Sequence, residues 1–170
     1  MTNGRKQHIS QEKPNRLKKF DYSQNGAYFV TICTKNKQCI LSKILGGGVL
    51  DAPLVELSDY GKTVDKQINT MNTVYSNISV EKYVIMPNHI HMLIFVDNPY
   101  GTSGTPSPTN AVIPAFVSTF KRFCNKQTDK KLFQRSFHDH IIRDDADYNK
   151  ICNYIENNPA KWQEDCFYCE

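Results

Sequence analysis

Residues 78–96 read Ile-Ser-Val-Glu-Lys-Tyr-Val-Ile-Met-Pro-Asn-His-Ile-His-Met-Leu-Ile-Phe-Val, two strand-like runs on either side of a Pro-Asn pair. Pro87-Asn88 is a short turn signal, so Ile78–Met86 and His89–Val96 predict a tight antiparallel hairpin. Because side chains alternate across a strand, His89 and His91 face one side while Ile90 anchors the other. Two adjacent imidazoles are half of a metal site, although neutral histidines also serve simply as buried hydrogen-bonding groups.

The residues around this hairpin predict the rest of an antiparallel sheet and its helices. Residues 27–34 are rich in β-branched and aromatic side chains and predict the first long strand. Gly46-Gly47-Gly48 allows the positive φ of a turn and predicts a second hairpin between residues 39–45 and 49–57. Apolar spacing predicts helices over 59–75 with Ser58 as N-cap, 113–126 and 144–157, and residues 137–143 predict a short strand. This order predicts an α+β fold, an antiparallel sheet with helices packed mainly on one face, ferredoxin-like or RRM-like.

The predicted helix over 113–126 carries Phe116, Phe120 and Phe123 at helical spacing. That periodicity favours core packing over a surface on which bases stack. Lys121 and Arg122 lie off the aromatic stripe, and we expect them to contact DNA if the protein binds it.

Length and composition predict one domain without a membrane span. Domains usually run about 100–150 residues, so the 170 residues divide into an arm over 1–20 and one domain over 21–170. Residues 97–110, rich in Gly, Pro, Ser and Thr, predict a mobile loop within it. No run approaches the roughly 20 apolar residues of a membrane helix, and the polar N-terminus is unlike a signal peptide. We therefore expect a cytoplasmic protein, no membrane partner, and thiols at all six cysteines.

The net charge of +4 is unevenly distributed. Residues 1–20 contain six lysines and arginines against Glu12 alone, so the arm carries +5 and the remainder −1. A basic arm suits sequence-independent contacts with nucleic-acid phosphates, and it equally suits a solubilising tail. The candidate DNA-binding residues of the arm are Arg5, Lys6, Arg16, Lys18 and Lys19.

The last predicted helix places a phenol, an amide and an amine on one face. Tyr154 and Asn158 stand four residues apart, and Lys150 lies one turn before Tyr154. A tyrosine nucleophile stores the energy of a cleaved phosphodiester in a phosphotyrosine bond, so cut strands can be rejoined without an external energy source. The alternatives are a half-buried Tyr154 on an apolar stripe and an Asn158 that caps the helix before Pro159. Tyr148 is a rival nucleophile, but it sits on a different face.

A second His-x-His triplet, His138-Asp139-His140, competes with the first. Its charged middle residue cannot anchor a strand in a core as Ile90 can, so it makes a poorer metal clamp. His138 and His140 remain candidate auxiliary groups that protonate a leaving oxygen or contact DNA.

Three stretches together resemble the REP-associated tyrosine transposases, a branch of the single-tyrosine HUH transposase family. They are residues 83–93 (Tyr-Val-Ile-Met-Pro-Asn-His-Ile-His-Met-Leu), 134–143 (Gln-Arg-Ser-Phe-His-Asp-His-Ile-Ile-Arg) and 154–159 (Tyr-Ile-Glu-Asn-Asn-Pro). Residues 21–33 fit as well, and the resemblance extends from about Arg16 to Trp162. The order of the three motifs is specific, although each motif alone is not.

The resemblance implies an RRM-like HUH nuclease domain with His89 and His91 as metal ligands, Asn158 in the place of the third ligand, and Tyr154 as the catalytic nucleophile. The metal would be Mg²⁺ or Mn²⁺. The implied activity is transposase-type nicking and rejoining of single-stranded DNA beside hairpin (REP-like) sequences, through a 5′-phosphotyrosine intermediate. Insertion-sequence relatives carry Gln at the position of Asn158 and exchange the tyrosine helix within a dimer. The REP-associated branch can act as monomers, so both a monomer and a homodimer are open.

Two other functions fit parts of the sequence. One is an RRM-like module that binds nucleic acid without catalysis, and the other is a zinc hydrolase that uses His89, His91 and a cysteine. The intact set of candidate catalytic residues argues against the first. The absence of an H-E-x-x-H motif or paired carboxylates argues against the second.

Overall fold

A computed structural model describes residues 25–46, 53–97 and 112–168. The basic arm, most of the predicted loop over 97–110 and the glycines at 47 and 48 lie outside the described residues. The predictions that concern them therefore remain predictions.

Four antiparallel strands form the main sheet, in the order β4-β5-β1-β6. They are β1 (Gly26–Cys33), β4 (Ile78–Ile85), β5 (His89–Val96) and β6 (His138–Ile142). Helix α1 (Asp59–Val74) connects β1 to β4 in the chain, and α2 (Val112–Thr128) lies between β5 and β6. This is the βαββαβ order and strand arrangement of a ferredoxin-like or RRM-like fold, which confirms the predicted fold class.

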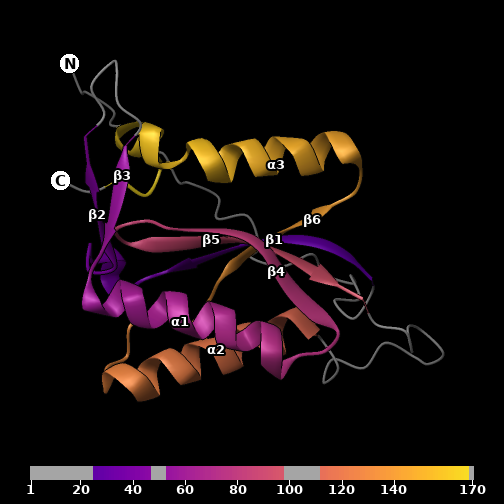
Figure 1. Cartoon of the computed structure of the whole chain (residues 1–170), viewed down its shortest axis with the longest axis horizontal. Helices are drawn as coiled ribbons and strands as arrows, with labels where there is room; N and C mark the ends of the chain where they lie inside the picture. Colours follow the sequence, from indigo (N-terminus) through magenta and orange to yellow (C-terminus); the bar gives the residue numbers. More distant parts are fainter. Residues whose placement is uncertain (1–24, 47–52, 98–111, 169–170) are drawn as a thin grey trace, which may run out of the picture.

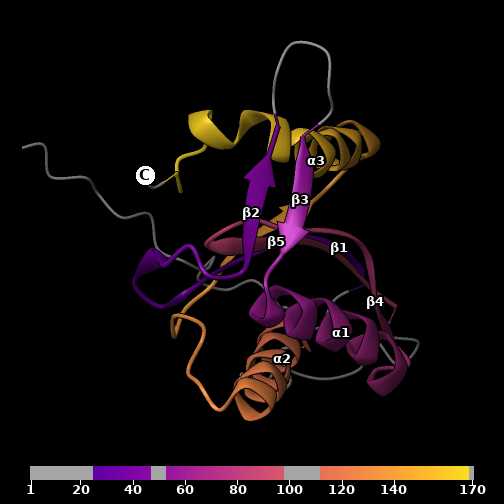
Figure 2. The same cartoon turned by 60° about the vertical axis from the view of Figure 1, so that its left-hand side comes forward.

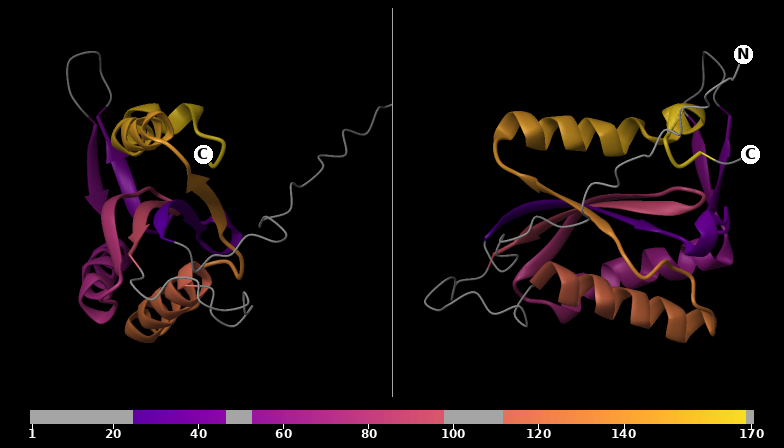
Figure 3. Two further views of the ribbon diagram at one scale, coloured as in Figure 1. Left: turned by 90° about the vertical axis from the view of Figure 1, so that its right-hand side faces the viewer. Right: turned by 180° about the vertical axis from the view of Figure 1, so that it is seen from behind.

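Helices cover both faces of the sheet unequally. Figure 1 shows α1 and α2 side by side beneath the sheet and α3 (Asp145–Asn157) above it, and the rear view in Figure 3 agrees. The larger core lies between the sheet and the α1–α2 pair. Phe116 and Phe120 are fully buried there and Phe123 packs against its margin, so the aromatic stripe is core, as its spacing predicted.

The face of the sheet that α3 covers has a smaller apolar cluster. Ala27, Leu93 and Ile155 are buried in it, and Phe29 and Ile151 pack against them. Alternation along β5 sends Ile90, Met92 and Ile94 into the larger core. His89, His91 and Leu93 therefore project to the α3 side.

A second, two-stranded sheet pairs β2 (Ser42–Leu45) with β3 (Leu54–Leu57), which confirms the hairpin predicted around the glycines. It stands beside α3 and the 3₁₀ helix η3 (Pro159–Glu164) in Figure 2. β2 begins three residues later than predicted. The reason is that the Leu41 N–H bonds the Pro87 carbonyl at 2.9 Å and the Ser42 hydroxyl bonds the Ile85 carbonyl at 2.9 Å. The start of this stretch is thus tied to the β4–β5 turn, before strand pairing begins.

The prediction of thiols at every cysteine is wrong at Cys39, which is disulfide-bonded. Among the described residues, Cys33, Cys124, Cys152 and Cys166 are free thiols. The prediction failed because disulfide formation depends on the distance between cysteines, which their spacing in the sequence does not give. In the described part of the chain, no helix has the length and apolar character that a membrane crossing requires.

Candidate active site

The two histidines of β5 lie side by side under α3. His89 and His91 are 0% and 1% exposed, and the ring nitrogens Nε2 of the two residues are 3.0 Å apart. In the β1–β5 register His89 is opposite Cys33 and His91 is opposite Thr31. Pairing with β1 thus fixes the positions of both histidines on the sheet. Ile90, which lies between them in sequence, is buried in the larger core, as predicted.

Hydrogen bonds on the other ring nitrogens orient both imidazoles. The Asn88 amide oxygen lies 2.8 Å from Nδ1 of His89, and the Asn88 amide nitrogen donates to the Phe167 carbonyl at 2.7 Å. An amide oxygen only accepts, so His89 carries its proton on Nδ1 and presents a lone pair on Nε2. His91 has the Thr31 hydroxyl 2.8 Å from its Nδ1. Partners on Nδ1 are the usual means by which proteins aim Nε2 at a metal ion.

Burial keeps both rings neutral. Burial lowers the pKa of His89 to about 4, and burial together with repulsion from His89 lowers the pKa of His91 to about 3. Neutral imidazole is the form that binds metal ions, so the pair is ready for coordination at neutral pH.

Helix α3 brings the phenol and the amide to this pair. Asp144 caps the start of α3, its carboxylate accepting from the Asp147 N–H at 2.8 Å. Nearly three turns after this cap, the Tyr154 hydroxyl lies 3.3 Å from Nε2 of His91, and the side chain is 40% exposed. Tyr148, on another face, donates instead to Glu81 at 3.1 Å. The tertiary structure therefore places Tyr154, and not Tyr148, at the histidines of its own chain.

Asn158 is buried beside Tyr154 and has an unused acceptor. It is 3% exposed, its amide nitrogen donates to Asp165 at 2.9 Å, and its Oδ1 has no hydrogen-bond partner among the described residues. A buried unpaired oxygen is costly, and a bound cation would satisfy it. The resemblance implied that Asn158 is the third metal ligand, and this role stays a prediction.

Asp165 is a site residue that the sequence did not predict. After η3 the chain turns back, and the Asp165 Oδ2 lies 3.4 Å from the Tyr154 hydroxyl and 4.0 Å from Nε2 of His89. Ligand atoms of His89, His91 and Asp165 all lie within 4.8 Å of one another. Burial raises the pKa of Asp165, but hydrogen bonds from the Phe167 N–H and the Asn158 amide, with the nearby histidines, outweigh it and lower the pKa. The carboxylate is thus a charged oxygen donor.

Tyr154 needs activation. Burial, and next the charge of Asp165, raise the pKa of its phenol to about 12. The hydroxyl is protonated at neutral pH, so a nucleophilic role requires that its proton be accepted during the attack.

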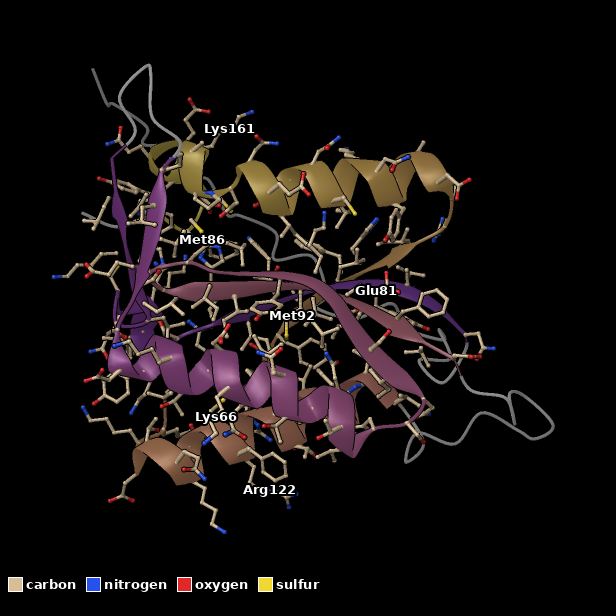
Figure 4. All side chains as sticks on the ribbon, in the orientation of Figure 1. Lys66, Glu81, Met86, Met92, Arg122 and Lys161 are labelled. Atoms are coloured by element: carbon tan, nitrogen blue, oxygen red, sulfur yellow. The ribbon has the colours of Figure 1, made fainter. Side chains whose placement is uncertain are left out.

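A pocket of about 410 Å³ opens on the exposed side of Tyr154. Lys150 and Lys161 line it, together with Asn158 and Asp165. Figure 4 labels Lys161 at the end of the molecule where η3 follows α3. The predicted auxiliary residue Lys150 therefore lies beside Tyr154. Two lysines next to the phenol can attract an anionic substrate.

The second His-x-His triplet lies on the same face of the sheet as the first. His138 pairs with Thr31 across the β1–β6 ladder and its ring is 6.5 Å from that of Phe167, which in turn lies 4.7 Å from the ring of His89. His140 is bound to Asp147 at 2.7 Å. His138 therefore lies at the margin of the site, and His140 ties β6 to the start of α3.

No protein-family model matches the chain. A Haemophilus influenzae protein named only as an uncharacterized protein is 30% identical over 178 residues, 95% of this chain and 96% of the relative. A second Haemophilus influenzae protein, named "Putative REP-associated tyrosine transposase", is 27% identical over 153 residues, 83% of this chain and 74% of its own length. The chain is similar to a putative REP-associated tyrosine transposase. Its sequence resemblance to this family is thereby confirmed.

The REP-associated tyrosine transposases also share its fold. A solved structure of a REP-associated tyrosine transposase bound to a REP hairpin superimposes with a TM-score of 0.59 and 17% identity, covering 86% of this chain and 73% of that one. At this identity the likeness establishes the fold.

We expect the metal-free protein to lose stability as the pH falls from 7 toward 4. Below the ordinary histidine pKa of 6.5 the unfolded chain protonates His89 and His91, whereas the folded chain keeps them neutral down to about 4 and about 3. Unfolding then takes up protons and is favoured as pH falls. Urea denaturation with EDTA at a series of pH values measures this loss. A His89→Asn/His91→Asn variant should show a shallower decline, and equal slopes in the two proteins would contradict the assignment.

Proposed function

We propose that this protein is a metal-dependent tyrosine (HUH) DNA endonuclease and transposase. It would nick and rejoin single-stranded DNA next to hairpin (REP-like) sequences through a covalent 5′-phosphotyrosine. The observation that carries the proposal is the Tyr154 hydroxyl 3.3 Å from Nε2 of His91, which is itself 3.0 Å from Nε2 of His89. A phenol beside two metal-ligating nitrogens is the minimum that a metal-assisted tyrosine nucleophile needs.

The donors fit a divalent ion. Two neighbouring ligands of an octahedral Mg²⁺, each at about 2.0–2.1 Å, stand about 3 Å apart, which is the separation of the two histidine nitrogens. The unpaired Oδ1 of Asn158 and the carboxylate of Asp165 add the oxygen donors that Mg²⁺ and Mn²⁺ favour. When bound, the ion would polarise a phosphoryl oxygen of the substrate.

The protein groups have distinct roles in the cleavage step. The Tyr154 oxygen forms a bond to phosphorus and the bond between phosphorus and the 3′ oxygen breaks, which leaves a 5′-phosphotyrosine and a free 3′ hydroxyl. The Tyr154 proton passes to Asp165, whose Oδ2 already accepts a hydrogen bond from it at 3.4 Å. Lys150, on the pocket wall, and His138, at the site margin, are suited to hold the substrate phosphate or protonate the departing oxygen. Religation reverses these movements.

The active unit is a monomer or homodimer in which Tyr154 acts in cis. Its hydroxyl contacts the histidine of the same chain, so no exchange of α3 is needed to complete the site. The alternative of a non-catalytic RRM-like module shares the fold but gives no reason for the paired histidines beside the phenol. A zinc hydrolase is disfavoured because, among the described residues, the third potential ligand grouped with His89 and His91 is Asp165 and not a cysteine.

A denaturing gel tests the proposal. The full chain is incubated with single-stranded DNA that is labelled at its 3′ end and carries a REP-like hairpin with flanking single strands, with Mn²⁺ and separately with Mg²⁺. We expect a labelled band at the protein's position that survives denaturant and disappears with EDTA. Noncovalent binding without any such band, in either metal and over several hairpins, would instead support the non-catalytic module.

The basic arm is proposed to read the hairpin backbone. Deleting residues 1–19 should weaken hairpin binding and flatten its salt dependence, because fewer phosphates are neutralised by Arg5, Lys6, Arg16, Lys18 and Lys19. Fluorescence anisotropy over a range of salt concentrations measures both quantities. If hairpin affinity and its salt dependence are unchanged, the arm serves only as a solubilising segment.

A further inference from the structure

A second concave surface lies on the opposite side of the sheet from Tyr154. It is a pocket of about 370 Å³ between α2 and the segment that leads into β6. Its polar lining comes from Ser118, Lys121, Arg122, Asn125 and Arg135, and none of the described residues that line it is acidic. Figure 4 places Arg122 on α2, away from α3. The proposed chemistry at Tyr154 makes no use of this pocket.

Lys121 stabilises one wall of this pocket through hydrogen bonds to the backbone. Its ammonium donates to the carbonyls of Gln134, Arg135 and Ser136 at 2.9, 3.3 and 2.8 Å. One side chain thus fixes three successive peptides and with them the backbone of Arg135. The sequence predicted Lys121 as a DNA-binding residue, and the structure gives its ammonium a positioning contact in the pocket wall.

Arg122 and Arg135 supply the exposed positive charge. Both side chains are exposed, and no carboxylate in the described parts of the chain forms a salt bridge with either. The Arg122 guanidinium lies over the Phe123 ring at 5.7 Å, which limits its freedom. Two guanidinium groups at one pocket without a carboxylate partner suit a phosphate group, because the planar fork matches phosphate oxygens.

The pocket and the candidate active site meet at the same strand. β6 is an edge strand of the four-stranded sheet, and it begins at His138, directly after the pocket residue Phe137. Figure 3 shows the chain rising through β6 from the layer of α2 to that of α3. His138 faces the Tyr154 side, and the histidines of β5 are two strands further in, about 10 Å at the usual strand spacing. An extended nucleic-acid strand can therefore pass from one site to the other around this edge.

We propose that Arg122 and Arg135 bind a backbone phosphate of the single-stranded DNA whose neighbouring nucleotides enter the Tyr154 pocket. The inference rests on the proposed function for the identity of the strand. The contact is independent of base sequence, since it involves phosphate alone. It guides the single strand over β6, past His138, and leaves the hairpin to other parts of the protein.

Fluorescence anisotropy with a labelled oligothymidylate of about 20 nucleotides tests the contact, because this probe offers phosphates without a hairpin. Arg122→Ala/Arg135→Ala in the full chain should bind at least about tenfold more weakly at low salt, with the log–log salt slope smaller by about 0.7, the contribution of one lost phosphate contact. Arg122→Lys/Arg135→Lys should keep most of the slope. Lys62→Ala/Lys66→Ala on α1 removes two exposed charges elsewhere and should change affinity less than twofold.

Each outcome decides the proposal. Equal affinity and slope in the alanine pair and the unchanged chain, an equal loss in the Lys62/Lys66 control, or no binding of the probe by the unchanged chain overturns it. Circular dichroism and melting temperatures check that the variants are folded, and the lysine pair supplies the comparison if the alanine pair is not. Failure of the covalent-adduct gel with this binding pattern intact would reject the proposed chemistry while retaining the pocket.

Discussion

Tyr154→Phe should abolish the covalent protein–DNA adduct, with a loss of at least about 10³-fold, since removal of a catalytic nucleophile typically leaves only the contributions of binding and electrostatics. Phenylalanine preserves the edge-on ring contact of Tyr154 with Phe29, whose centroids are 5.8 Å apart, and removes only the hydroxyl 3.3 Å from His91. The measurement is single-turnover adduct formation on denaturing gels with saturating hairpin DNA and Mn²⁺.

Tyr148→Phe is the matched control, because it removes the other phenol of α3. Its hydroxyl contacts Glu81 rather than the histidines, so adduct formation should change by less than about threefold, as expected for a surface hydrogen bond. An adduct that persists in Tyr154→Phe and vanishes in Tyr148→Phe would reverse the assignment of the nucleophile.

His91→Ala should remove Mn²⁺-dependent cleavage, with a loss of at least about 100-fold, because it deletes a proposed metal ligand. Loss even of the hydrogen bond that supports a ligand typically costs 10–100-fold. Nε2 of His91 lies 3.0 Å from Nε2 of His89 and 3.3 Å from the Tyr154 hydroxyl, so His91 contacts both the other histidine and the phenol. Calorimetric titration with Mn²⁺ provides a second measurement that does not depend on catalysis.

Thr31→Val tests the orientation of the His91 ring separately from its proposed role as a metal ligand. It removes the hydroxyl 2.8 Å from Nδ1 of His91 and keeps the ligand, so Mn²⁺ affinity should fall by about 10–100-fold without disappearing. His138→Ala, on the same face, should leave Mn²⁺ affinity unchanged. If His91→Ala bound Mn²⁺ as tightly as the unchanged protein, the histidine pair would not be the metal site.

Much of the fold was predictable because its signals are local. The Pro87-Asn88 turn and the alternation around Ile90 are contained within a few residues, and they predicted the β4–β5 hairpin and the direction of His89 and His91. The helical spacing of Phe116, Phe120 and Phe123 likewise predicted the buried side of α2. The same periodicity placed Tyr154 and Asn158 on one face of α3.

Asp165 shows what local signals omit. It lies seven residues beyond Asn158, outside the helical repeat, and reaches the site only because η3 turns the chain back after Pro159. Its neighbours in sequence show no pattern that marks a ligand, although any carboxylate near the candidate helix could have been noted. The disulfide at Cys39 likewise depends on a folded distance between cysteines, which local patterns do not give.

The sequence by itself determined the elements of this protein, their buried sides and the presence of a histidine pair and a phenol, because hydrophobic periodicity and turn chemistry act over a few residues. Only the tertiary structure decided which groups meet. The β1–β5 register set Thr31 beside His91, the packing of α3 on the sheet set Tyr154 there, and the turn after η3 added Asp165. Each of these depends on pairing between segments far apart in the chain, where a shift of one residue would turn the side chains to the opposite face.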